Sequence, residues 1–401
     1  MWPRILNATI TAACCCGAYW TLRAGFAAYA AADFDKSALE RGIRWTPGNP
    51  DYYAALAEAD PAGALAAIRK AAELNPYSSG VWMEYSRVAE ARTDFSVAEA
   101  CLLKAVHLDN TFAPRWLLSE YYYRRGDARR FWPAIQGALA KSYDDVSPLF
   151  QKCWELTSDP DAVLQVMPPR ADVLSQYLDF LVNQKNRLDL AVTVAERLQG
   201  FPDPKITSSP LNLCDRLLQA GQAGEAVRIW NGLARARLVP PGQLPGEHGA
   251  ALTNGKFLQP FLEHGFDWRM TAVDGVYERG ASDGSLRFTF SGKQPEQCEL
   301  LSQWVPLTAG HKYKFRVRYE TDGLEGETGL AWRVLDAKGG ADLLAGSGRL
   351  AASTGAEQGL VFAAPANSSL ARLVLGYQRV LGSSRISGSV TLSQSSVEFA
   401  E

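Results

Sequence analysis

The chain has 401 residues, and its 41 basic and 43 acidic side chains give a formal net charge of −2, which excludes a polycation that coats nucleic acid. Apolar residues make up 47% and charged residues 21%, a globular composition that excludes a largely disordered chain, a small disulfide scaffold and a polytopic membrane protein. At roughly 150 residues per domain, the length predicts two or three domains.

The first segment with a clear character is residues 5–22, which carry no charge and lie between Arg4 and Arg23. At 1.5 Å per residue such a helix is ~27 Å long, just enough to span a hydrocarbon core. We expect residues 1–23 to form a signal anchor that holds the chain in a bacterial inner membrane as a single-pass protein, with its bulk in the periplasm. The alternatives are a cleaved signal peptide, a lipoprotein, or the first helix of a soluble, cytoplasmic protein.

Residues 24–237 are rich in Ala, Leu, Arg and Glu, which predicts a series of short helices. An internal repeat of 34 residues runs through the segment. It is carried by Trp82 and Trp116, by Ala64, Ala98 and Trp132, by Ala71, Ala105 and Leu139, and by the helix-ending triplets at 74–76 and 108–110. We therefore predict an array of stacked helix pairs.

This register resembles the tetratricopeptide repeat, which places a Trp early in its first helix, small Ala residues in the second and Pro at the end of the unit. One unit is filled by Trp82, Ala98, Leu102, Ala105 and Asn110, and Trp116 with Tyr123 opens the next. The resemblance covers residues 30–237 and implies five or six helix pairs in a right-handed solenoid.

The resemblance also implies a protein partner in the concave groove of the solenoid. The run at 121–125 offers an aromatic and basic groove wall, with Tyr121, Tyr122, Arg124 and Arg125 as candidate groove residues. The alternative is that the tyrosines pack in the core and the arginines are solvated.

Residues 238–249 read LVPPGQLPGEHG, and their density of Pro and Gly predicts a linker. Beyond it, residues 250–401 alternate apolar and polar side chains between Gly-rich turns. We predict strands at 285–291, 298–305, 313–321, 329–336, 359–364, 370–377 and 387–399. Seven or eight short strands predict an antiparallel β-sandwich, so the chain as a whole is a multidomain α and β protein.

The detail of this half resembles the galactose-binding jelly roll of carbohydrate-binding modules. The matching elements are Asn-Gly-x-Phe at 254–257, Gly-Phe-x-Trp at 265–268, and the Gln-x-Val-x-Leu-x-x-Gly-x-x-Tyr pattern at 303–313. The resemblance implies a jelly-roll fold and, as an expectation, a sugar ligand. Such modules often hold calcium through a glutamate just after the first element. Leu258 stands there in this chain, so we expect no calcium site.

Two sets of side chains in this half are candidate ligand sites. Aromatic rings stack on pyranose faces, and the candidate glycan-binding rings are Trp268, Trp304 and Tyr377, whereas Trp332 alternates with apolar neighbours and is predicted to be core. The strand at 313–321 begins in a perfect alternation of charge. Its outward cations are Lys312, Lys314, Arg316 and Arg318. They form a candidate face for an acidic polysaccharide or lipid headgroups, and the alternative is that this face is simply solvated.

Signals for catalysis and for metals or cofactors are weak. The Gly-x-Ser-x-Gly match at 280–284 lacks a following helix and is predicted to be a turn, and no phosphate-binding loop occurs. Seven cysteines and four histidines show no ligand spacing, so we expect no metal and no cofactor.

The arrangement resembles bacterial repeat proteins associated with exopolysaccharide or O-antigen production. We therefore expect a non-enzymatic, membrane-anchored envelope scaffold that binds a protein partner through its repeats and a polysaccharide, but no nucleic acid, through its β-sandwich. The alternatives are a purely structural assembly protein, whose β domain makes protein contacts, and a carbohydrate-active enzyme.

Overall fold

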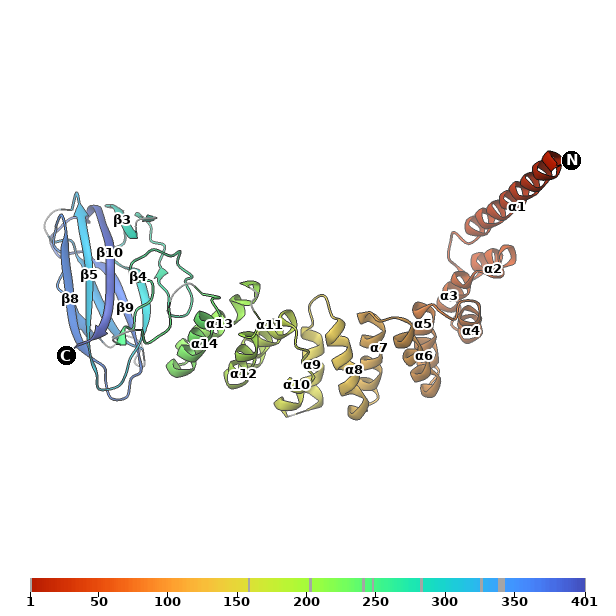
Figure 1. The fold of residues 1–401 in the computed structure, drawn as a ribbon, viewed down its shortest axis with the longest axis horizontal. Helices are drawn as coiled ribbons and strands as arrows, with labels where there is room; N and C mark the ends of the chain where they lie inside the picture. Colours follow the sequence, from red (N-terminus) through yellow and green to blue (C-terminus); the bar gives the residue numbers. More distant parts are fainter. Residues whose placement is uncertain are drawn as a thin grey trace. The chain divides into compact units, whose positions relative to one another are not determined.

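The computed structural model describes residues 2–157, 159–201, 204–239, 242–246, 249–281, 284–324, 327–337 and 343–400. The chain divides into two compact units, Met1–Pro168 and Pro169–Glu401. Helices make up the first unit, and the second combines helices with two antiparallel sheets (Figure 1). The predicted fold class, a tetratricopeptide-like helical array followed by an antiparallel β-sandwich, is confirmed.

The first unit consists of short helices that pack against their neighbours in sequence. Most of them begin behind an Asp, Asn or Ser whose side chain accepts a hydrogen bond from a backbone N–H group of the first turn, which stops the helix from extending backwards. The helices are α1 (Trp2–Ala30), α2 (Lys36–Trp45), α3 (Pro50–Ala59), α4 (Ala64–Leu74), α5 (Ser79–Ala91), α6 (Phe95–Leu108), α7 (Phe112–Arg124), α8 (Ala128–Lys141), α9 (Ser147–Leu156) and α10 (Pro160–Val166).

The repeat residues occupy the positions that the 34-residue period predicts. Trp82 and Trp116 lie in the consecutive odd-numbered helices α5 and α7, half-buried. Ala98 and Ala105 lie in α6 and are fully buried. Because alanine adds no side chain beyond Cβ, the paired helices can approach closely at these points.

Helix α1 differs from the others because most of its described side chains are exposed. Residues 9–22 are all exposed, among them Ile10, Trp20 and Leu22, and α1 packs on α2 only near its end, where Ala27 is fully buried. Over the part of the chain that the structure describes, no helix combines the length and the apolar character needed to cross a membrane.

The second unit opens with helices and continues into the strands. The helices are α11 (Ala171–Phe180), a π-helical turn η1 (Leu181–Lys185), α12 (Leu188–Leu198), a 3-10 turn η2 (Pro204–Ile206), α13 (Ser208–Gln219) and α14 (Ala223–Arg235). The strands are β1 (Arg269–Met270), β2 (Val276–Ala281), β3 (Ser285–Ser291), β4 (Gln297–Pro306), β5 (Lys312–Asp322), β6 (Leu330–Asp336), β7 (Leu343–Gly346), β8 (Ala356–Ala363), β9 (Leu370–Gln378) and β10 (Ser387–Phe399).

The strands form two five-stranded antiparallel sheets, which we call sheet A (order β1-β4-β9-β6-β7) and sheet B (order β2-β3-β10-β5-β8). Large rings fill the space between them. Trp332 is fully buried, as its alternation predicted, and its ring centroid lies 4.9 Å from that of Phe315 and 6.2 Å from that of Trp268. The inner faces are thereby committed to packing, and ligands must bind on the outer faces or at the edges.

Within the second unit, helices α13 and α14 are docked on the sandwich. Trp230 of α14 is fully buried against Phe266, edge to face at 6.0 Å between ring centroids. Asp215 of α13 accepts a hydrogen bond from the Gly265 backbone N–H at 2.8 Å and pairs with Arg269 at 2.5 Å. The last helix pair and the sandwich therefore share one polar and aromatic interface.

Part of the predicted linker, residues 238–249, belongs to the same packing. Val239 and Leu244 are buried, and the backbone N–H of Leu244 donates to Asn231 Oδ1 at 2.7 Å. The side-chain amide of Asn231 donates in return to the Leu244 carbonyl. This pair of hydrogen bonds ties Leu244 to α14.

Candidate functional site

Two of the three aromatic candidates cannot hold a sugar. Trp268 and Tyr377 are 0% and 1% exposed in the sandwich core, so neither ring offers a free face, and this part of the prediction is corrected. Trp304 is half-buried on the outer face of sheet A, directly across from Arg372 in the neighbouring strand. It is the one ring of the three with any accessible surface.

The prediction that Tyr121 and Tyr122 line a groove wall is wrong, because both rings lie in the core. Tyr121 and Tyr122 are buried, and their hydroxyls donate to the Phe95 carbonyl and to Glu99 of α6. Burial raises the pKa of Tyr122 to about 12, so the phenol stays protonated and acts as a hydrogen-bond donor. Both rings therefore join α7 to α6 and are structural.

The two arginines of that run have different surroundings. Arg124 pairs with Glu90 of α5 at 2.7 Å, while the Arg125 guanidinium lies 3.8 Å from the centroid of the Phe95 ring. Arg124 also lines a cavity of about 580 Å³ between α3, α5 and α7, together with Glu58, Met83 and Leu117. This cavity combines exposed apolar surface with ion-paired side chains.

A second cavity, of about 620 Å³, lies on the outer face of sheet B. Its walls come from four strands and from the turns at their ends. The lining residues are Gly284, Ser285, Arg318, Tyr319, Glu320, Gly355, Ala356, Glu357, Thr391 and Ser393. We call it the sheet B cavity.

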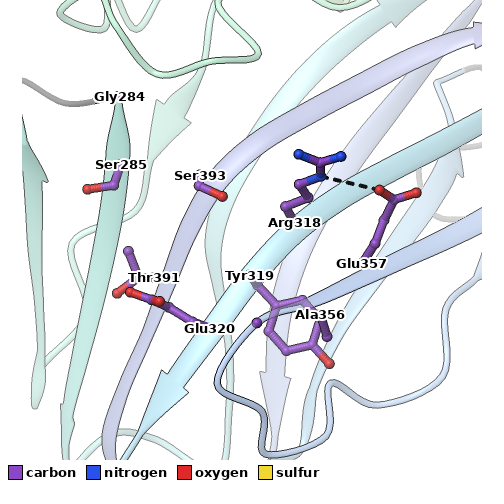
Figure 2. Close-up of a pocket in the computed structure, with 10 residues that line it drawn as sticks. Gly284, Ser285, Arg318, Tyr319, Glu320, Ala356, Glu357, Thr391 and Ser393 are labelled. Atoms are coloured by element: carbon purple, nitrogen blue, oxygen red, sulfur yellow. Dashed lines mark hydrogen bonds and ion pairs between the residues drawn. The ribbon is translucent and has the colours of Figure 1, made fainter.

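The register of sheet B explains which polar groups meet there. Glu320 of β5 lies directly across from Thr391 of β10, and Figure 2 shows its carboxylate extending toward that hydroxyl. On the other side of β5, Arg318 lies across from Glu357 of β8, and Nε of the arginine is 3.4 Å from the carboxylate. The cavity thus combines one guanidinium, two carboxylates and several hydroxyls.

A bulge in β10 shapes the cavity. The register of β10 against β5 shifts between Leu392 and Gln394, which leaves Ser393 without a directly opposed residue. A bulge of this kind bends a strand and re-aims the side chain of the extra residue. Ser393 is exposed and lies on the cavity wall, beside Arg318 in Figure 2.

The four predicted cations of β5 all face outward, as the alternation requires. Exposed and buried residues alternate from Lys312 through Glu320. Arg318 belongs to the sheet B cavity, and Lys312, Lys314 and Arg316 continue in a line away from it. The structure therefore brings the predicted cationic face and the cavity into one continuous surface.

Most residues of the cavity could not be predicted from the sequence. Ser285, Glu320, Glu357, Thr391 and Ser393 come from strands that are more than a hundred residues apart at the extremes. Alternation within each strand indicates that such residues face outward. It does not give the strand order that places β3, β10, β5 and β8 side by side.

The described residues form neither a metal site nor a hydrolase site at the positions considered in the sequence. Among the described residues, no group of three or more His, Cys, Asp or Glu side chains is placed to hold a metal ion. In the Gly-x-Ser-x-Gly match, Ser282 and Asp283 lie outside the described residues, and the match connects the antiparallel strands β2 and β3.

Asp267, in the Gly-Phe-x-Trp element, is fully buried, and its Oδ2 accepts a hydrogen bond from the Leu262 backbone N–H at 2.7 Å. Burial raises its pKa above the ordinary 3.8, opposed by that hydrogen bond. The unfolded chain therefore binds fewer protons than the native state between the two pKa values, and this residue lowers stability as the pH rises through that window.

Replacing Asp267 with Asn keeps an acceptor for Leu262 and removes the titration. We expect the free energy of unfolding of D267N, relative to that of the wild type, to increase as the pH is raised from 4 to 7. Urea denaturation at each pH measures this difference. Asp267→Ala, which loses the acceptor, should be destabilised at every pH. A difference between D267N and wild type that is constant with pH, or that falls as the pH rises, would contradict the assignment.

No family model matches the chain, and no curated protein matches it. Solved structures similar to part of the chain include one described as "CBM4 structure and function" (12% identity, 37% of this chain and 100% of that one, TM-score 0.31). Another is the module TmCBM61 in complex with β-1,4-galactotriose (15% identity, 38% and 99%, TM-score 0.26).

The MamA protein is similar to 41% of this chain over 94% of its own length, at 15% identity and a TM-score of 0.33. These similarities are to a tetratricopeptide-repeat protein and to carbohydrate-binding modules, each over part of the chain.

Proposed function

We propose that the chain is a non-enzymatic scaffold that binds glycan on the outer face of sheet B and a protein partner in the groove of its helical array. The observation that supports glycan binding best is the sheet B cavity. Its guanidinium, carboxylates and hydroxyls are the groups that exchange hydrogen bonds with the hydroxyls of a sugar. Because the aromatic rings of the core are buried, a sugar on sheet B would be bound through polar contacts.

Glycan binding at this cavity is tested by filling it. Ser393→Trp places a large ring on the exposed bulge of β10, where no packed neighbour has to move. We expect the full-length variant to fold normally and to lose at least about tenfold in affinity, because sugar and indole compete for the same space. Affinity electrophoresis in gels that contain a panel of neutral and acidic polysaccharides measures this.

The matched control is Thr271→Trp, an equally large ring on an exposed residue outside the cavity. It should bind like the wild type. If no polysaccharide retards the wild-type protein, the glycan proposal fails and a purely structural role for the sandwich is favoured. If Ser393→Trp binds as well as the wild type, the glycan site lies elsewhere, with Trp304 as the next candidate.

The proposal for a protein partner is supported by the cavity between α3, α5 and α7. Met83 and Leu117 supply apolar surface there, and Arg87 and Arg124 supply charge. A photo-reactive residue at position 83 should cross-link to one dominant partner, whereas the same residue at position 104, exposed on α6, should not. Equal labelling from both positions would contradict a groove site.

We further propose that α1 attaches the protein to the bacterial inner membrane, with the bulk of the chain in the periplasm and a role in polysaccharide production or export. The exposed apolar residues along α1 support an attachment. In cell fractionation, the full chain should sediment with membranes and a chain that starts at Ala24 should not. A full chain found only in the soluble fraction would overturn the attachment.

A further inference from the structure

We propose that the glycan is an acidic, carboxylate-bearing polysaccharide that lies along strand β5, with its carboxylates on Lys312, Lys314 and Arg316. This inference rests on the proposed glycan-binding function and names the class of polymer that sheet B takes. It starts from the direction in which β5 presents its side chains. The inward residues, Tyr313, Phe315, Val317 and Tyr319, are buried and hold the strand in place.

The outward residues of β5 form a regular array of positive charge. Alternate residues of a strand are separated by about 7 Å, so Lys312, Lys314 and Arg316 extend over about 14 Å. Arg318 is the next outward residue in the same line. We call these three residues the cation row. Its regular spacing suits a polymer that repeats its charge at intervals.

The three side chains of the cation row form no ion pair within the described part of the chain. Among the described residues, no carboxylate lies within ion-pair distance of these three side chains, whereas on the same face Arg287 pairs with Asp322 at 3.0 Å and Arg318 with Glu357 at 3.4 Å. The nearest acidic group in the register is Glu398, which lies across from Lys314 on β10. On the neighbouring strands, the carboxylates of Glu398 and Glu357 lie across from the four cations of β5, and Glu320 follows Arg318 on β5 itself.

The neighbours of Arg316 and Lys312 are small, which leaves room for a ligand at these two positions. Arg316 lies between Ser396 of β10 and Gly359 of β8, and Lys312 lies across from Ala363. Gly359 has no side chain that could cover the arginine. A polymer chain can therefore lie directly on the strand and reach the charged groups from above.

The surroundings favour a polysaccharide over other polyanions. At Arg318 the row continues into the sheet B cavity, whose hydroxyls and carboxylates suit sugar hydroxyls. Single-stranded nucleic acid needs aromatic platforms for its bases, and a membrane surface needs inserted apolar groups. Among the described residues, few large apolar side chains are exposed near the row. Val361 lies across from Lys314, Phe399 lies at the end of β10, and Tyr277 lies on β2.

The test measures binding of full-length protein to polygalacturonate, a carboxylate polymer, and to neutral galactan by isothermal titration. We expect polygalacturonate to bind more tightly, with an affinity that falls as salt is raised. The triple variant K312Q/K314Q/R316Q should lose roughly 30-fold for polygalacturonate, since each exposed charge contact is worth about threefold. Its affinity for galactan should be unchanged.

The matched control is K104Q/K141Q/K293Q, which removes the same charge from positions outside the cation row. It should bind polygalacturonate within about twofold of the wild type, because a net-charge effect alone is screened by salt. An equal loss in both triple variants would overturn the site. So would dextran sulfate or single-stranded DNA binding as tightly as polygalacturonate, because the row would then be an unselective polyanion surface.

The remaining outcomes separate this inference from the proposed function. If galactan binds and polygalacturonate does not, the glycan function stands and the acidic class is wrong. If neither polymer binds, the glycan function fails together with the inference. Circular dichroism of each variant shows whether the sandwich is intact.

Discussion

Replacing Gly255 with alanine should destabilise the β-sandwich by about 3 kcal/mol, because the added methyl group has no space beside strand β10. A Cβ at position 255 would lie 2.1 Å from the Ser395 carbonyl oxygen. That oxygen is fixed in β10, since the Ser395 backbone N–H and hydroxyl both donate to the Gly255 carbonyl. The added carbon must therefore displace a strand.

The measurement is the urea midpoint of the sandwich transition, followed by the fluorescence of its buried tryptophans. The matched control is Gly280→Ala on β2, where no atom lies within 4 Å of the new Cβ. It should change stability by less than about 0.5 kcal/mol. Equal midpoints for the two variants would show that the contact with Ser395 relaxes freely.

Replacing Asp215 with alanine should uncouple helices α13 and α14 from the sandwich. The carboxylate binds Arg269 at 2.5 Å, the Gly265 backbone N–H at 2.8 Å and His264 Nδ1 at 2.6 Å. Its removal therefore leaves three groups without their hydrogen-bond partner. Removing one partner of a fully buried ion pair costs roughly 3 to 5 kcal/mol. Asp215 and Arg269 are about one-fifth exposed, and we expect a smaller loss of about 2 kcal/mol.

Calorimetry of the full chain measures this loss. In the wild type the helix pair and the sandwich should unfold in one transition, and in D215A the helix pair should unfold at a lower temperature than the sandwich. Asp322→Ala is the control, because it removes a comparable but exposed pair with Arg287 and should cost less than about 0.5 kcal/mol. Two separate transitions already present in the wild type would refute the coupling.

The architecture follows from periodicities that can be read in the sequence. The 34-residue step places Ala98 and Ala105 on the buried side of α6, and the alternation of β5 places its cations outward. Both patterns are local, since each depends on residues of one or two adjacent elements. Local patterns of this kind are therefore sufficient for the fold class and for the direction of the cation row.

The candidate site depended on packing that no local pattern contains. Trp268 lies outside any alternating strand, and it is buried against Phe257, which precedes it, and Trp332, which lies far along the sequence in β6. Tyr377 lies in β9, where apolar residues occupy both faces, so alternation does not distinguish its direction. The sheet B cavity likewise depends on the order of strands in the sheet.

The most direct test of a glycan site on sheet B is a lysine acetylation footprint of the full-length protein, with and without polygalacturonate. We expect the polymer to slow acetylation of Lys312 and Lys314 severalfold, because bound carboxylates cover both ammonium groups. Lys104 and Lys141, exposed on helices α6 and α8, should react at unchanged rates. Unprotected Lys312 and Lys314 at saturating polymer, or equal protection of all four lysines, would contradict a glycan site on this face.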